Sequence, residues 1–259
     1  MVFPLGDLEK TRIIPVVTYA LIVLNVMMYL VELDRGPGFK VAYAMTPYEI
    51  THRIDIQEPF YLPDPDANNA SIARRGDPDT AIVIEQSPIL IPVWMTLFSS
   101  MFLHGSPLHL AGNMLYLWIF GDNVEEVLGT FRYIIIYLTC GLAGSLLQIA
   151  AAPESLIPTL GASGAIAGVM GMYLIWFPHN RVRVLLFRYI TEMPAFFVIG
   201  FWIAIQLFEG YGALGSVGAS GGVAYLAHIG GAIAGIVAAF VFFDRARTVI
   251  LEHSRYRWQ

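Results

Sequence analysis

Residues 158–181 (PTLGASGAIAGVMGMYLIWFPHNR) constrain the fold of this chain most. An apolar run begins at the Gly-Ala-Ser-Gly turn around Ser163, and Pro178 ends it. At about 1.5 Å per residue a helix between these two residues is about 22 Å long, shorter than a bilayer core of about 30 Å. If its arginine end lies at the cytoplasmic face, Ser163 lies below the opposite surface. A nucleophile at that depth makes sense only for chemistry inside the membrane.

The composition supports a membrane protein and excludes several other classes. Of 259 residues, 56% are hydrophobic and 14% are charged, against about 25% charged in an ordinary soluble domain. A net charge of −5 argues against a nucleic-acid partner. The lone Cys140 excludes an internal disulfide and a cysteine-rich metal site. We expect no cleavable signal peptide, because the first apolar run is long enough to span a bilayer.

The apolar runs predict an all-α, polytopic membrane protein with a single domain over residues 1–259. Six spans are expected, at residues 13–31, 108–124, 131–151, 163–177, 195–208 and 223–243. Residues 1–12 are assigned to a cytoplasmic N-terminus and 244–259 to a cytoplasmic tail. Residues 32–107 form a long outer loop whose stretch 89–103 is expected to be partly immersed. A glycine-rich, uncharged segment, 210–222, is expected to be a mobile lid over the outer end of the fifth span.

Basic residues set the expected orientation through the positive-inside rule. With cytoplasmic termini, the cytoplasmic face carries Lys10, Arg12, Arg132, Arg181, Arg183, Arg188, Arg245, Arg247, Arg255 and Arg257. The remaining basic residues all lie in the long outer loop, where the rule has little weight. We therefore expect both termini in the cytoplasm.

Ser163 and His228 are the strongest candidates for catalysis. From His228 to Asp244 a helix is about 24 Å long, so both side chains are expected at the same depth. Glycines at matching positions in the two spans would let these helices approach closely. A histidine that takes the proton of a serine hydroxyl is the minimum for acyl transfer. The alternative is structural: His228 binds a neighbouring carbonyl and Ser163 caps its helix.

His109 and Asn113 lie four residues apart, on one helix face. Both can donate hydrogen bonds to an oxyanion; the alternative is polar contact between helices. His104 is expected to order the entry into this helix. A histidine metal site is not favoured, because no carboxylate or cysteine stands at ligand spacing in the spans and His-Glu-x-x-His is absent from the sequence.

Four motifs in this order resemble the rhomboid family of intramembrane serine proteases. They are the turn 161–164, HLAGN at 109–113, Ala-His before Gly231 and Gly235, and GDNVE at 121–125, and the resemblance covers about residues 95–243. It implies a six-helix bundle with a polar cavity open to the outside and no metal or cofactor. It also implies roles for individual residues: Ser163 as nucleophile, His228 as base, His109, Asn113 and the Ser163 N–H as oxyanion hole, and Glu125 as organiser of the turn after the second span.

The sequence departs from the family pattern at two places. Trp94 is followed by Met95 and Thr96 where many members have Trp-Arg. One turn after the serine, Ala167 replaces an aromatic residue that packs on the catalytic histidine. Another group must therefore orient His228, and the sequence does not identify it.

The resemblance implies an endopeptidase that cleaves single-span membrane proteins near the outer face, in a prokaryotic inner membrane. One alternative is a rhomboid-like protein that binds clients without cleaving them. A channel or transporter is the other, but such proteins commonly have inverted repeats, and the two halves of this sequence show no convincing repeat.

Overall fold

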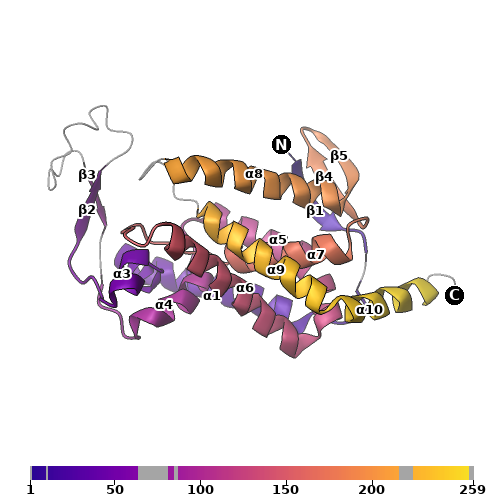
Figure 1. Ribbon diagram of the computed structural model, residues 1–259, viewed down its shortest axis with the longest axis horizontal. Helices are drawn as coiled ribbons and strands as arrows, with labels where there is room; N and C mark the ends of the chain where they lie inside the picture. Colours follow the sequence, from indigo (N-terminus) through magenta and orange to yellow (C-terminus); the bar gives the residue numbers. More distant parts are fainter. Residues whose placement is uncertain (1, 10, 64–80, 85–86, 216–223, 257–259) are drawn as a thin grey trace.

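The computed structural model describes residues 2–9, 11–63, 81–84, 87–215 and 224–256. Most of them are helical (Figure 1). The long helices are α1 (Val16–Arg35), α5 (Pro107–Leu128), α6 (Thr130–Ala151), α7 (Ser163–Trp176), α8 (Ala195–Gly215), α9 (Tyr225–Val241) and α10 (Phe243–Tyr256). Short helices α2 (Pro37–Tyr43), α3 (Pro47–His52) and α4 (Thr96–Ser99), with 3₁₀ turns at Val93–Met95 and Ser100–Phe102, lie between α1 and α5.

A long helix stands at each expected span, with shifted ends. Helix α5 runs to Leu128, four residues beyond the expected end, and α8 runs to Gly215 rather than 208. The expected lid 210–222 is thus helical in its first part, and its remainder, 216–222, lies outside the described residues. By length and hydropathy α1 and α6 are long and apolar enough to cross a membrane, and α9 with α10, bent by 71°, would make a third. A six-span topology stays a prediction.

The centre of the bundle is α7, which packs against α5, α6, α8 and α9. Nearly all its side chains are buried, including Tyr173 and Trp176. A helix buried on all sides has to be apolar around its whole circumference, and the sequence of α7 meets this requirement. Its N-terminal residue, Ser163, is therefore held by the best-packed element of the protein.

Glycines bring the backbones of α7 and α9 into direct contact. A Cβ atom placed on Gly231 would lie 1.9 Å from the carbonyl oxygen of Gly164, and one on Gly235 would lie 2.0 Å from that of Gly168. Both distances are far below any real Cβ contact, so only glycine fits. The structure confirms the glycine contact expected between these two helices, which we call the α7–α9 seam.

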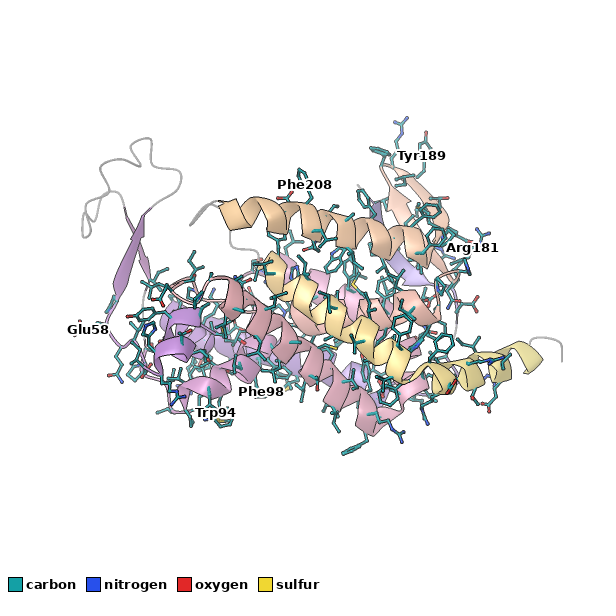
Figure 2. All side chains as sticks on the ribbon, viewed as in Figure 1. Glu58, Trp94, Phe98, Arg181, Tyr189 and Phe208 are labelled. Atoms are coloured by element: carbon teal, nitrogen blue, oxygen red, sulfur yellow. The ribbon has the colours of Figure 1, made fainter. Side chains whose placement is uncertain are left out.

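A small sheet corrects the all-α prediction. Strands β1 (Val2–Asp7), β4 (Arg181–Leu186) and β5 (Tyr189–Pro194) form an antiparallel sheet in the order β1-β4-β5. Figure 2 shows Tyr189 on the β4–β5 hairpin, pointing away from the helices. A second pair, β2 (Phe60–Pro63) and β3 (Ala81–Ile84), lies in the segment expected to be an irregular outer loop.

The end of β1 is anchored to the helices through Asp7. Its carboxylate accepts hydrogen bonds from the Nδ2 of Asn123 (2.9 Å) and from the hydroxyl of Tyr173. Burial raises the pKa of Asp7, and the hydrogen bonds from the Glu9 N–H and from Tyr173 partly offset this rise. Strand β1, in a segment expected only as a short tail, is therefore bonded to α5 and α7 through Asp7.

The side chain of Glu125 binds the start of α1, whereas the family resemblance implied that it organises the turn after the second span. Its two carboxylate oxygens accept hydrogen bonds from the backbone N–H groups of Val17 (3.0 Å) and Thr18 (2.8 Å), and from the Thr18 hydroxyl (2.8 Å). These two N–H groups belong to the first turn of α1, where backbone N–H groups have no hydrogen-bond partner within the helix. A carboxylate on α5 thus caps α1, where negative charge also suits the helix dipole.

We expect Glu125→Ala to lower the free energy of unfolding by about 3 kcal/mol, because it leaves buried N–H groups without an acceptor. The measurement is thermal unfolding in detergent micelles. Asp34→Ala, which removes a carboxylate with 82% of its side chain exposed, is the matched control and should melt like wild type. Equal melting temperatures for both variants would contradict the capping role.

Candidate active site

Ser163 and His228 meet at the N-terminal end of the α7–α9 seam. The Oγ of Ser163, the first residue of α7, lies 2.7 Å from the Nε2 of His228, in the first turn of α9. His228 is 9% exposed. The spacing of the two sequences along their helices placed both residues at one depth, and the structure brings them within hydrogen-bond distance. Among the described hydrogen bonds Ser163 does not cap its helix. His228 does bond a carbonyl oxygen, the amide oxygen of Gln206, but through Nδ1, while its Nε2 contacts Ser163.

The turn before Ser163 requires a glycine at position 161. Gly161 has φ +126°, a conformation that favours glycine, and its N–H donates to the carbonyl of Ser100 (2.8 Å). A Cβ here would lie 2.8 Å from Cε1 of His109 and 3.5 Å from Oγ of Ser163. The missing side chain therefore leaves the space that the imidazole of His109 and the serine hydroxyl share.

His109 directs one ring nitrogen toward that space. Its Nδ1 accepts a hydrogen bond from the backbone N–H of Gly105 (3.4 Å), so in the neutral ring Nε2 carries the proton. Nε2 lies on the side of Gly161, 3.0 Å from the position of a Cβ there. The backbone of His109 is fixed as well, since its N–H donates to the Oγ of Ser106 (3.1 Å), the N-cap of α5. The arrangement provides an N–H donor beside Ser163.

Asn113 is held by His104. The Nδ2 of Asn113 donates to Nε2 of His104 (3.0 Å), and the backbone N–H of His104 lies 3.0 Å and 3.2 Å from the two carboxylate oxygens of Glu32 at the end of α1. His104 thus fixes the entry into α5, as the sequence predicted, and it also orients the amide of Asn113. Among the described residues this is the one hydrogen bond of the Asn113 amide nitrogen, which leaves its second N–H to bind another acceptor.

Part of the expected outer loop supports the turn that carries Ser163. Met45, just before α3, exchanges two backbone hydrogen bonds with Thr159 (2.9 and 2.8 Å), and Tyr48 donates to the carbonyl of Ser155 (3.0 Å). The segment between α6 and α7 is therefore fixed by residues of the α2–α3 region. This portion of the long loop has a structural function that its composition does not show.

Gln206 of α8 is the site residue that the sequence prediction missed. Its Oε1 lies 2.6 Å from Nδ1 of His228. Two rings flank the imidazole, Trp202 at 5.6 Å and Tyr225 at 6.4 Å between centroids. The imidazole of His228 thus has neighbours on α8 and α9, whereas position 167 is alanine where the family resemblance implied an aromatic residue. The available signal was a single polar residue in the otherwise apolar run 195–208.

Within the described residues, no group of three or more His, Cys, Asp or Glu side chains is placed to hold a metal ion. The rings of His104 and His109 meet edge to face, with centroids 5.2 Å apart. What the site offers is a serine hydroxyl bonded to an imidazole, with N–H donors beside it.

We expect Gly231→Ala to lower stability and any activity together, because its Cβ would overlap the carbonyl of Gly164. Overpacking of this kind costs about 3 kcal/mol. Gly200→Ala, on α8 with nothing within 4 Å of its Cβ, is the control and should melt at or above the wild-type temperature, since alanine favours helix over glycine. Melting of the two variants at one temperature would show that the α7–α9 seam does not determine stability.

Comparisons with known proteins identify a family for most of the chain. Residues 92–245 match the Rhomboid domain family. The chain is 32% identical over 147 residues to the mitochondrial Rhomboid protein 1 of Saccharomyces cerevisiae, covering 55% of this chain and 40% of the yeast protein. It is 35% identical over 157 residues to Rhomboid protease GluP of Bacillus subtilis, covering 60% of this chain and 27% of GluP. Over 145 residues it is 33% identical to the mitochondrial RHOMBOID-like protein 6 of Arabidopsis thaliana, covering 56% of this chain and 42% of the Arabidopsis protein. The matches thus cover less than half the length of these relatives.

Proposed function

The chain belongs to the rhomboid family, and from that premise we propose that it is an intramembrane serine endopeptidase. The observation that carries the proposal is the 2.7 Å contact between Oγ of Ser163 and Nε2 of His228 within the matched domain. In a serine–histidine dyad this is the contact through which the proton leaves the hydroxyl.

The proposed reaction is acyl transfer to Ser163 followed by hydrolysis. Oγ forms a bond to the scissile carbonyl carbon while Nε2 of His228 takes the hydroxyl proton. The oxyanion is bound by N–H groups of His109, Asn113 and the Ser163 backbone. When the C–N bond breaks, His228 returns its proton to the leaving amine. Water then attacks the acyl-enzyme by the same proton transfers and releases the second product.

We propose single-span membrane proteins as substrates, because the site lies among helices apolar enough for a bilayer. The proposed topology has six spans and both termini in the cytoplasm. In Figure 1 the N-terminal strand β1 and the C-terminal helix α10 lie away from the end where α3 and α4 lie, which supports a common side for the termini. The prokaryotic inner membrane stays a prediction, since relatives carry mitochondrial and chloroplastic names as well.

The entry of substrate through the outer end of α8 is also a proposal. Phe208 is 78% exposed and points away from the bundle on the outer side of α8 (Figure 2), so this face suits contact with lipid or with a substrate helix.

The second candidate is a rhomboid-like protein that binds clients without cleaving them. Such a protein does not need a serine at hydrogen-bond distance from a histidine. The intact contact between Ser163 and His228 therefore favours the protease.

Replacement of the nucleophile tests the proposal. Ser163→Ala should abolish cleavage of a transmembrane reporter in lipid vesicles and leave a folded protein. Ser145→Ala, at a buried serine of α6, is the matched control and should cleave like wild type. Cleavage by Ser163→Ala at the wild-type rate would contradict the proposed dyad.

The proposed base predicts a pH dependence. His228 accepts a proton only as the neutral imidazole, so turnover should fall about tenfold for each pH unit below its pKa and stay constant above it. The pH–rate profile in vesicles measures this, with circular dichroism at each pH as the control for folding. A rate that stays constant with falling pH as far as the protein remains folded would argue against a histidine base.

A further inference from the structure

A buried glutamine completes a chain of hydrogen bonds from α8 to the serine. Gln206 is 8% exposed, and its Oε1 lies 2.6 Å from Nδ1 of His228, whose Nε2 lies 2.7 Å from Oγ of Ser163. An amide buried among apolar helices has few other partners, and an unpaired polar group there is costly. The contact is therefore a strong one, and it involves the ring nitrogen that faces away from the reaction.

The partner of Nδ1 decides what Nε2 can do. A neutral imidazole carries one proton, on one nitrogen or the other. If Nδ1–H donates to the oxygen of Gln206, Nε2 has its lone pair directed at Ser163 and can accept the hydroxyl proton. An amide turned the other way would donate to Nδ1 and place the proton on Nε2, which cannot then act as a base. An acceptor at this position selects the productive tautomer.

We propose that Gln206 is the positioning residue of the active site, whose Oε1 accepts the Nδ1–H of His228 and so fixes the tautomer and direction of the base. The inference rests on the proposed protease function. In soluble serine proteases an aspartate holds the histidine in this way. Here a neutral amide does so, without the cost of a charge buried among apolar helices. The ring of Trp202, one turn earlier on α8, restricts the imidazole further.

The other titratable groups near His228 do not replace Gln206 as the partner of Nδ1 among the described hydrogen bonds. His109 of α5 acts on it electrostatically, Tyr225 of α9 contacts its ring edge to face, and Cys140 of α6 lies against Gly168 in the next turn of α7. On α8 the nearest acidic residue, Glu209, is exposed. The hydrogen bonds of the described residues give none of these groups a bond to Nδ1.

Two substitutions separate the acceptor from the space it fills. In Gln206→Met the new side chain has a similar length but only a weak thioether acceptor in place of the amide oxygen. This variant should lower kcat on the order of 10²-fold, the scale of a misplaced catalytic group, with KM unchanged. Gln206→Glu keeps an acceptor oxygen and should stay within about tenfold of wild type at alkaline pH. Gln148→Met is the matched control, because Oε1 of Gln148 on α6 has no partner among the described residues. It should keep the wild-type kcat.

The pH–rate profile provides a readout that a purely structural role would not move. A carboxylate beside the imidazole favours its protonated form, so the acid limb of Gln206→Glu should lie at higher pH than that of wild type. All variants are measured in vesicles with the transmembrane reporter, after a check of melting temperature.

The outcomes distinguish this inference from the proposed function. If wild type cleaves the reporter and Gln206→Met keeps its kcat, the positioning role is wrong and the dyad stands. Gln206→Glu being as slow as Gln206→Met, with an unshifted acid limb, would also overturn it. If wild type itself cleaves no membrane reporter, the proposed function fails and the inference fails with it.

Discussion

The contact between the backbones of α7 and α9 is the constraint on which the rest of the structure depends. The carbonyl groups of Gly164 and Gly168 lie where side chains at Gly231 and Gly235 would have to be. Inside a bilayer there is no hydrophobic gain from bringing helices together, so close packing has to hold them. The same contact sets the distance between Ser163 and His228, since each stands within one turn of the seam.

Around this seam several buried polar groups pair with one another. Glu125 caps α1, and Glu32 at the other end of α1 holds the backbone of His104, whose ring orients Asn113. Oε1 of Gln206 binds Nδ1 of His228. Buried polar groups are costly unless they are paired, so these pairs fix both ends of α1 and three helices around the site. Stability and the geometry of the site therefore depend on the same contacts.

Much of the architecture could be predicted from hydropathy and spacing. The long apolar runs marked the helices, and counting residues from Pro178 and Asp244 placed Ser163 and His228 at one depth. Glycine spacing predicted the α7–α9 seam. These features are local, because each depends on the residues of one helix or on the same glycine spacing in two helices.

The features that were missed depend on contacts between distant segments. The sheet pairs Val2 with Leu186, and the arginines of β4 had been interpreted only as a topology signal, although Arg181 and Arg183 alternate with buried valines. Likewise, a lone glutamine in an apolar run indicates a polar partner but not which one. The distance from Gln206 to His228 depends on the packing of α8 against α9, which no spacing within α8 specifies.

The central claim is that packing of α7 on α9 makes Ser163 a nucleophile by placing it against His228. The most direct test is mass spectrometry of the protein in lipid vesicles after reaction with a fluorophosphonate. The account predicts an adduct on Ser163 in wild type and none in a folded His228→Ala variant. An adduct that forms equally fast in that variant, or on another residue, would contradict it.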